Sequence, residues 1–399
     1  MKVAFNARYL YDPGLRGFNR YAFCLLRALE KIPGVEITLL SEERYPVHQV
    51  YKSALRAQIR NLSAPKTLLW EQWVLPRYLK RSRPDVFHAP ADGGLPLRKQ
   101  CPYVLTLHGV PVPSLASLVQ AGELTGTASS YLDTASNRSS LLATSVDRIR
   151  AWLLRHIYLQ AADLVITVSE FSKSELVRFL GLRPDRIRVI YEGADETFSQ
   201  CLPPGYLEEV RAKYGLPSRF LLFVGGFDRR KNVSTLLRAF ARITSREPDV
   251  ALVLVGIGGD IDGCKLEATS LGFPNAGRVF FLHRISDREL AALYRSAMLF
   301  VTLSWHEGFC LPVVEAMTAG CAVLGSSFGA IPEIIGEGGW LVDPRRIDNV
   351  VEAITTILRQ SGVRQELQSR ALLRARSFSW EKAAKETVKV YEELSETCA

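Results

Sequence analysis

The sequence predicts an α/β protein with two similar halves. Short runs of β-branched and other apolar residues alternate with stretches whose apolar residues recur every three or four positions, as expected for strands that alternate with helices. The alternation breaks near residues 195–218, where Pro203-Pro204-Gly205 and Leu216-Pro217 stand, and then begins again. Such alternation produces parallel sheets covered on both faces, so each half is predicted to hold one parallel sheet between helices.

The first half begins with a strand and a helix. Residues 3–5 predict the strand, and Asn19 is expected to cap a helix whose apolar positions include Ala22, Leu25 and Leu29. Residues 114–147 are rich in Ser, Thr and Ala and are expected to form a flexible insertion, either a lid or a disordered segment. Further strands of this half are expected at residues 37–40, 86–88, 103–107, 164–168 and 187–190.

The second half repeats the pattern and ends in a long helix. Its strands are expected at residues 220–224, 250–255, 279–282, 299–303 and 322–325. Ser379 is expected to cap the last helix, whose apolar stripe comprises Trp380, Ala384, Val388, Tyr391 and Leu394. The predicted division is a first domain at 1–200, a linker at 201–217, a second domain at 218–378 and a C-terminal helix at 379–399.

The composition indicates a globular protein that works among anions. The formal charge of +9 and the pI of about 9.2 favour sugar nucleotides, phospholipid surfaces or nucleic acid, but no nucleic-acid recognition motif accompanies the charge. The longest apolar runs, such as residues 250–257, are too short to span a bilayer, and the N-terminus does not have the pattern of a signal peptide. Seven irregularly spaced cysteines do not predict a disulfide framework, so the cytoplasm is the expected compartment.

The densest basic stretch lies at residues 77–83 and follows Trp70, Trp73 and Leu75. A basic amphipathic segment with tryptophans is typical of contact with an anionic membrane. The alternative is a helix that buries its aromatic residues in the core and keeps its charges in water. The sequence modestly favours this alternative, because the polar residues before the stretch are not clearly on one side.

Residues 304–317 carry two glutamates eight positions apart. Gly308 permits a turn that a Cβ would oppose, and Pro312 suits the start of a helix. Glu307 is therefore expected to end a loop, and Glu315 to lie in the first turn of the next helix, where a carboxylate is favourable. The amides between them, which are expected to attract an anion at the helix start, are those of Gly308, Phe309, Cys310 and Leu311.

A second segment places cations where a helix disfavours them. Residues 223–232 follow one predicted strand and precede a helix that Asn232 is expected to cap. Arg229, Arg230 and Lys231 thus crowd the positive end of that helix, and each placement costs roughly 0.3–1 kcal/mol. A bound anion would make these cations favourable at the helix start, so the segment predicts a diphosphate site.

The first half also offers candidate ligand contacts. Gly17 and Arg20 lie between the first strand and the first helix, where glycine allows close approach and arginine can meet an anion. No G-x-G-x-x-G follows that strand, so a dinucleotide site is not predicted there. His108 ends the strand at 103–107, and the carboxyl end of a central strand faces the ligand crevice of an α/β fold.

Taken in register, these motifs resemble those of the retaining glycosyltransferases of the GT-B fold, family 4 (glycosyl transferases group 1). The phrase of this family, S-x-x-E-G-F-G-L-P-x-x-E-A-M-A-x-G, matches residues 304–320 nearly throughout, with Cys310 for the usual Gly. Arg230 and Lys231 fall on the family's V-G-x-x-x-x-R-K-N phrase, in which Gly226 replaces a common Arg. The resemblance covers most of residues 1–395, excluding 114–147.

The resemblance implies a fold and a set of roles. Two Rossmann-like domains would face each other across an active-site cleft, and the last helix would cross back onto the first domain rather than pack on the second. The Gly17–Arg20 loop would face the donor phosphates and the acceptor. The implied catalytic and donor contacts are Arg230 and Lys231 on the diphosphate, Glu315 on the ribose, Glu307 on the sugar hydroxyls and His108 on the transferred sugar.

The implied reaction is transfer of a hexose from a nucleotide diphosphate sugar to a hydroxyl of a glycan or lipid-linked glycan, with retention. Residues 70–76 and 84–90 look like those of bacterial mannosyltransferases of surface polysaccharide and lipopolysaccharide assembly, so GDP-mannose is the first choice of donor. No metal or cofactor is expected. A lipid-linked acceptor would bring the protein, as a peripheral protein, to the inner face of the cell membrane.

Other functions fit parts of the pattern. A UDP- or dTDP-hexose could replace GDP-mannose in the same reaction, and a sugar-nucleotide epimerase of the same fold would release an isomerised donor without any acceptor. A non-catalytic sugar-nucleotide-binding protein is a third interpretation. The presence of both glutamates and of Arg230 and Lys231 argues against a loss of catalysis. Asp260 and Asp262 could suggest a D-x-D metal site, yet alternate carboxylates are common by chance and no metal site is predicted.

Overall fold

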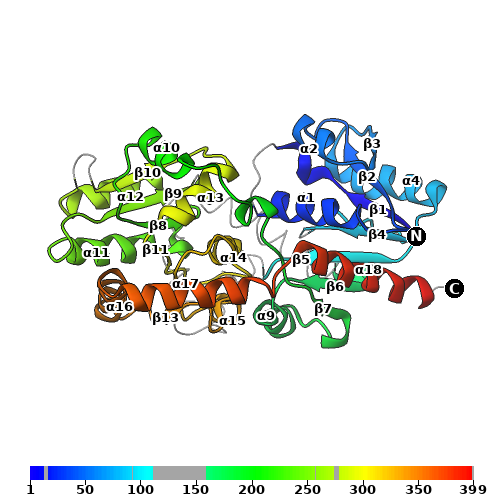
Figure 1. The fold of residues 1–399 in the computed structure, drawn as a ribbon. Helices are drawn as coiled ribbons and strands as arrows, with labels where there is room; N and C mark the ends of the chain where they lie inside the picture. Colours follow the sequence, from blue (N-terminus) through cyan, green and yellow to red (C-terminus); the bar gives the residue numbers. More distant parts are fainter. Residues whose placement is uncertain (13–16, 92, 111–158, 257, 274–277, 398–399) are drawn as a thin grey trace. The chain divides into compact units, whose positions relative to one another are not determined.

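The computed structural model describes residues 1–12, 17–91, 93–110, 159–256, 258–273 and 278–397 (Figure 1). The chain divides into two compact units. Among the described residues, unit 1 holds those up to 110, 159–192 and 379–397, and unit 2 holds those between 193 and 378. The insertion predicted at 114–147 lies outside the described residues.

Unit 1 contains one parallel sheet with the strand order β3-β2-β1-β4-β5-β6-β7. Its central strands are buried along their whole length, as parallel strands covered on both faces must be. The strands are β1 (Lys2–Asn6), β2 (Glu36–Glu42), β3 (Gln58–Leu62), β4 (Val86–Ala89), β5 (Tyr103–Leu107), β6 (Leu164–Thr167) and β7 (Ile187–Val189).

The helices of unit 1 follow the strands in the alternation that the sequence predicts. Helix α1 begins at Phe18 with Gly17 at its N-cap and no capping side chain, so the expectation that Asn19 caps it is wrong. Asn19 lies inside the first turn instead. The helices are η1 (Arg8–Tyr11), α1 (Phe18–Leu29), α2 (Gln49–Ala54), α3 (Thr67–Leu69), the π-helix η2 (Trp70–Val74), α4 (Leu75–Ser82), α8 (Leu159–Ala161), α9 (Glu170–Leu180), η4 (Pro184–Arg186) and α18 (Trp380–Thr397).

Unit 2 contains a second parallel sheet with the order β10-β9-β8-β11-β12-β13. The order reverses between β8 and β11, which makes their carboxyl ends the expected place for a ligand. The strands are β8 (Phe220–Val224), β9 (Ala251–Val255), β10 (Val279–Leu282), β11 (Leu299–Thr302), β12 (Val323–Ser326) and β13 (Trp340–Val342).

The helices of unit 2 bury apolar stripes against this sheet, with Leu237, Phe240 and Ile354 in its core. Residues 201–217, predicted as a linker, contain helix α10, which packs on α13 and belongs to unit 2. The helices are η5 (Glu196–Phe198), α10 (Tyr206–Lys213), η6 (Arg229–Lys231), α11 (Val233–Ile243), α12 (Ile261–Ser270), α13 (Asp287–Ser296), α14 (Leu311–Thr318), α15 (Ile331–Ile335), α16 (Ile347–Arg359) and α17 (Ser361–Ala375).

The last helix, α18, belongs to unit 1 although the chain reaches it from unit 2 (red in Figure 1). Ser379 caps it, because its Oγ accepts from the amide of Lys382 at 3.1 Å. Trp380 packs against Tyr21 of α1, and the Tyr391 hydroxyl lies 2.6 Å from Nδ1 of His88 in β4. The predicted crossing back onto the first domain is confirmed. No described helix is both long enough and apolar enough to cross a membrane.

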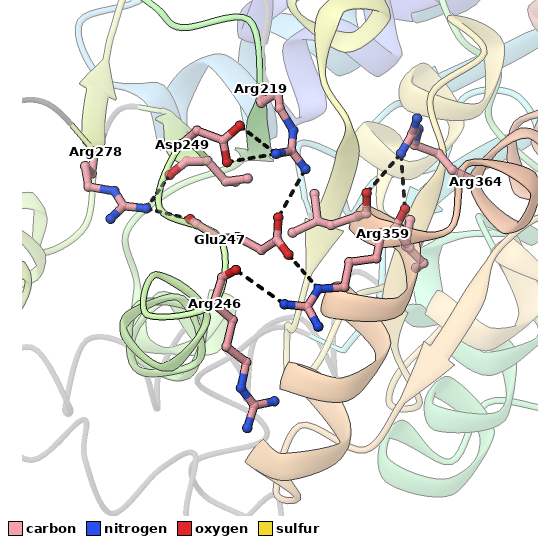
Figure 2. A network of polar contacts seen from close by, with 10 residues as sticks. Arg219, Arg246, Glu247, Asp249, Arg278, Arg359 and Arg364 are labelled. Carbon is pink, nitrogen blue, oxygen red and sulfur yellow. Dashed lines mark hydrogen bonds and ion pairs between the residues drawn. The ribbon is translucent and has the colours of Figure 1, made fainter.

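A network of arginines ties together the amino ends of the strands in unit 2 (Figure 2). Glu247 is buried there and accepts from Arg219 Nη2 at 3.2 Å and from Arg359 Nε at 2.7 Å. Arg278 donates to the carbonyl oxygen of Glu247 at 2.7 Å, whereas the side chain of Arg246 points away. Arg219 and Arg278 directly precede β8 and β10. Structural ion pairs therefore occupy the amino ends of these strands, and the carboxyl ends remain for a ligand.

Candidate active site

Three loops meet at the carboxyl ends of β8, β9 and β11 in unit 2. The turn after β8 and the turn after β9 run so close together that a Cβ on Gly256 would lie 1.7 Å from the carbonyl oxygen of Gly225. Phe227 donates its amide to the carbonyl of Gly258 at 2.9 Å, and the amide of Asp260 returns to Phe227 at 3.0 Å. These two glycine-rich turns therefore form one rigid support for the segment that follows, η6.

The η6 segment places its cations directly before α11, as the sequence predicts. The loop after β11 fixes its backbone, because the amide of Trp305 donates to the carbonyl of Arg230 at 2.9 Å. Asn232 stands at the N-cap of α11, but it does not cap it: φ is +54° and its side-chain amide donates to the carbonyl of Leu303 at 3.0 Å. This asparagine thus joins η6 to the loop after β11.

Glu307 accepts from both predicted phosphate-binding cations. Its Oε2 lies 2.8 Å from Arg230 Nη1, and its Oε1 lies 2.5 Å from Lys231 Nζ. Burial alone would raise the pKa of this carboxyl, but the charges of Lys231 and Arg230 outweigh it and lower the pKa to about 2. Arg230 also lies 3.4 Å from Asp228, which is half exposed. The cluster is therefore charge-balanced as it stands, with two cations facing two carboxylates.

A fourth loop, after β12, holds the Glu307 backbone in place. Gly329 has φ of +67°, and a Cβ added there would lie 2.7 Å from the Glu307 amide nitrogen. The amide of Ala330 donates to the carbonyl of Glu307 at 2.9 Å. The Gly-centred turn at residues 328–333 therefore positions a site residue.

Helix α14 begins at Leu311, and its N-cap is Cys310, with φ of +79°. Glu315 therefore lies in the second turn and not in the first, which corrects the expectation from the sequence. Its carboxylate is buried and accepts from the Tyr294 hydroxyl at 3.2 Å. The amides of residues 308–311 precede or open the helix as predicted; Phe309 is buried against Phe378, whereas Gly308 and Leu311 are partly exposed.

His108 lies just beyond the carboxyl end of β5 in unit 1, where the sequence places it. Its Nδ1 is 3.1 Å from Glu192 Oε1, and its Nε2 is 3.1 Å from the carbonyl oxygen of Pro90. Both partners are acceptors, so both contacts are hydrogen bonds only when each ring nitrogen carries a proton. The Tyr21 ring packs edge-on against the imidazole, with the centroids 4.5 Å apart. Glu192 was not identified from the sequence, because no local pattern indicates that it lies beside His108.

The loop before α1 contributes Gly17 and Arg20. Gly17 has φ of +44°, which a residue with a Cβ would adopt only under strain. Arg20 is buried in the first turn of α1 beside Tyr51; burial raises the pKa of that phenol to about 12, and the Arg20 charge acts to lower it. Arg20 thus faces neighbours within unit 1, and its predicted contact with the donor stays a prediction.

The two aspartates of the D-x-D sequence have different surroundings. Asp260 caps α12 by accepting from the amide of Gly263 at 2.8 Å, and Asp262 is fully in solvent. Within the described parts of the chain, no three His, Cys, Asp or Glu side chains gather in a way that could hold a metal ion.

Two Rossmann-like units, with a buried carboxylate between two cations at the carboxyl ends of the strands of the second, agree with the class that the resemblance implies, a glycosyltransferase of the GT-B fold. Two family models match the chain: Glycosyltransferase Family 4 over residues 15–198 and Glycosyl transferases group 1 over residues 208–374. Between them they cover both units. The chain therefore belongs to the glycosyltransferases of family 4 (glycosyl transferases group 1), as the resemblance implies.

Similar proteins include two from Escherichia coli. O-antigen chain mannosyltransferase B is 31% identical over 246 residues, which is 60% of this chain and 63% of that protein. The serotype-specific mannosyltransferase WbdA is 29% identical over 230 residues, which is 56% of this chain and 28% of that protein. The matched region thus spans less than two thirds of either relative.

Solved structures share the fold at lower identity. Anabaena Alr3699/HepE in complex with UDP and glucose has a TM-score of 0.73 and 19% identity, with 99% of this chain and 100% of that one covered. WaaG, a glycosyltransferase involved in lipopolysaccharide biosynthesis, has a TM-score of 0.70 and 17% identity, with 98% of this chain and 99% of that one covered.

Proposed function

We propose that this glycosyltransferase moves mannose from GDP-mannose to a hydroxyl of a glycan or lipid-linked glycan in polysaccharide or lipopolysaccharide biosynthesis, with retention at the anomeric carbon. The observation that carries the proposal is the buried Glu307 carboxylate held between Arg230 and Lys231 at the start of α11. The choice of mannose is supported by the names of the E. coli relatives.

In the proposed reaction the bond between the anomeric carbon and the diphosphate oxygen breaks, and the acceptor oxygen bonds to the same face of that carbon. The acceptor proton passes to the leaving diphosphate, so no separate general base is needed. Arg230 and Lys231 stabilise the negative charge that develops on this diphosphate. Such electrostatic stabilisation is usually the largest contribution to catalysis when a phosphate leaves. For that reason the reaction is proposed to need no metal ion.

The remaining site residues bind and orient. Glu315 accepts from the ribose diol, and the amides of residues 308–311 supply hydrogen bonds to the donor. Glu307 binds sugar hydroxyls when the diphosphate has taken over its two cations. His108 contacts the transferred sugar, with Glu192 as its positioning residue, and the Gly17–Arg20 loop is assigned to the donor phosphates and acceptor.

Donor identity is tested by titrating GDP-mannose, UDP-glucose and dTDP-glucose into the full chain by calorimetry. We expect GDP-mannose to bind most tightly and to be turned over when a mannose-containing acceptor is added. Tighter binding of the UDP sugar would instead support a UDP-hexose as the donor. The similar protein HepE was solved in complex with UDP and glucose. If none of the three binds, the assignment fails.

Product analysis separates the remaining alternatives. Mass spectrometry with and without acceptor distinguishes transfer from epimerisation, because an epimerase consumes the donor without an acceptor. The anomeric configuration of the product, read by NMR, tests retention. Turnover that a chelator abolishes would contradict the metal-independent mechanism. We further propose that the protein acts in the cytoplasm, at the inner face of the membrane, when its acceptor is lipid-linked.

A further inference from the structure

Three large apolar side chains stand in solvent within one short segment of unit 1. Leu68 and Leu69 of α3 are 65% and 45% exposed, and Trp73 of η2 is 61% exposed. Leu69 and Trp73 are four positions apart, which brings side chains of a helix onto one face. Single exposed apolar residues are normal on protein surfaces, but a cluster marks an interaction site.

The segment is held rigidly, so this exposure is not that of a loose loop. Trp70, three positions before Trp73, is fully buried. Glu71 is buried and lies 2.5 Å from Arg8, and the side chain of Gln72 both accepts from the amide of Leu97 at 2.8 Å and donates to the carbonyl of Leu95 at 3.2 Å. Of the two tryptophans that the sequence modestly favoured as core residues, only Trp70 is in the core; Trp73 is fixed facing outward.

Within residues 66–83 the exposed charges have a single sign. Between residues 66 and 83 the only carboxylate is that of Glu71, which is buried and paired with Arg8. The Arg77 guanidinium stacks on the Trp73 ring, 3.5 Å from its centroid. The exposed cations of this stretch are Lys66, Arg77, Lys80, Arg81 and Arg83.

We infer that this surface, comprising Leu68, Leu69, Trp73 and the five cations, docks on an anionic phospholipid bilayer. Tryptophan and leucine enter the boundary between headgroups and acyl chains, while lysine and arginine bind lipid phosphates. Charge complementarity favours this occupant, because a bilayer of anionic lipids presents phosphates to all five cations, whereas a partner protein would need a strongly acidic surface around an apolar patch.

The position of the surface suits a membrane-bound acceptor. Helix α3 follows the carboxyl end of β3, and Glu71 and Gln72 hold loops that follow the carboxyl ends of β1 and β4. His108 follows the carboxyl end of β5, so it lies at the same edge of this sheet. The inference rests on the proposed function only for the acceptor; binding to lipid does not require that function.

The test is co-sedimentation of the full chain with vesicles of phosphatidylcholine alone and of phosphatidylcholine mixed equally with phosphatidylglycerol. We expect binding to the mixed vesicles that weakens with added salt. Lys80→Gln with Arg81→Gln should weaken it by about fivefold for each cation removed, since each contributes about 1 kcal/mol near an anionic surface. Leu69→Ser with Trp73→Ser should weaken vesicle binding further. This pair should also abolish the binding that remains at high salt, where the charges are screened.

Matched controls are available in unit 2. Leu266 and Leu373 are 72% and 67% exposed, so Leu266→Ser with Leu373→Ser removes a similar apolar area elsewhere. Arg246→Gln with Arg376→Gln removes two exposed cations elsewhere. Both control pairs should bind vesicles as the wild type does. Equal losses in the control and test pairs, or no sedimentation with the mixed vesicles, would overturn the inference.

Two further measurements keep the result distinct from the proposed function. Turnover with a soluble oligosaccharide acceptor should be the same in the wild type and in all four paired variants, because none touches the candidate active site. Vesicle binding without any turnover would leave the surface standing and contradict the function. A concentration-dependent dimer that Trp73→Ser abolishes, together with no vesicle binding, would instead assign the surface to a second copy of the chain and overturn the inference.

Discussion

The Nζ atom of Lys231 lies 2.5 Å from Oε1 of Glu307, so the cation assigned to the donor diphosphate is already paired with a carboxylate. A diphosphate that binds there must compete with Glu307 for the same charge. In the proposed mechanism, the carboxylate neutralises two partly buried cations before the donor arrives and binds sugar hydroxyls once the phosphates have replaced it.

This competition predicts opposite effects of Glu307→Gln on binding and on turnover. Affinity for GDP should increase several-fold, because Arg230 and Lys231 lose their carboxylate partner. The value of kcat/KM for the donor should fall roughly 10- to 100-fold, the worth of a hydrogen bond to a charged group. Calorimetry with GDP and initial rates with GDP-mannose measure the two effects.

Asp228→Asn is the matched control for this experiment. Asp228 also faces Arg230, but at 3.4 Å and half exposed, so solvent screens it. Its replacement should change both quantities by less than about twofold. If GDP bound more weakly to the Glu307→Gln variant than to the wild type, the proposed competition would be wrong.

The second prediction concerns Glu192. The Glu192→Gln variant keeps an acceptor near Nδ1 of His108 but removes the charge, and Glu192→Ala removes both. Because the pair lies in unit 1 and the nucleotide is assigned to unit 2, GDP affinity should stay unchanged while kcat falls, with the larger loss in Glu192→Ala. Calorimetry measures the GDP affinity, and steady-state kinetics measure kcat. A parallel loss of GDP affinity and kcat would indicate a structural role for Glu192 and no positioning role.

The third prediction follows from the backbone of Cys310. A φ of +79° costs a side-chain-bearing residue roughly 1–2 kcal/mol, and a β-branched residue adopts it only as an outlier. Cys310→Gly should therefore be tolerated, whereas Cys310→Val should lower both Tm and turnover. Cys321 is buried but is not at positive φ, so Cys321→Val should have a much smaller effect. Equal Tm losses in the two valine variants would contradict this account.

The fourth prediction is a pH dependence of the stability of unit 1. Burial, helped by the His108 charge, lowers the pKa of His88 to about 3 from its ordinary 6.5. Below pH 6.5 the unfolded chain binds a proton that the folded chain refuses, so stability falls as the pH falls from 6.5 towards 3, by up to about 1.4 kcal/mol per pH unit. The neutral imidazole bridges Tyr391 and Thr106.

Hydrogen exchange measured by mass spectrometry on peptides from β4 and β5, at increasing urea concentrations, reports on this unit alone. The loss of stability between pH 6.5 and 5 should be clearly smaller in His88→Gln than in the wild type. The same loss in both proteins would mean that other groups cause the pH dependence.

Much of the fold could be predicted because buried parallel strands carry a strong local signal. The strands at 103–107, 220–224 and 279–282 have the predicted bounds. Strand β3 was missed because it is a largely exposed edge strand of polar residues, Gln58–Leu62, and therefore lacks an apolar run. Helix α10 was taken as linker because Pro203-Pro204-Gly205 and Leu216-Pro217 flank it closely.

The candidate site was predicted by residue type but not by pairing. Glu307 and Lys231 were both identified, yet nothing local shows that residues 76 positions apart share a hydrogen bond. The positions of Gly329 and Glu192 beside Glu307 and His108 likewise depend on packing between loops of different strands. Glu315 was placed one turn too early, because Pro312 indicates that a helix begins nearby without fixing its first residue.

Helix α18 fills part of the core of unit 1 with Trp380 and Tyr391, yet the ribosome adds these residues long after the rest of that unit. The amino-terminal half must leave the ribosome with that side of α1 and β4 uncovered, and it waits in that state while nearly two hundred further residues are made. Biogenesis of this enzyme therefore depends on whatever shields that apolar surface during translation.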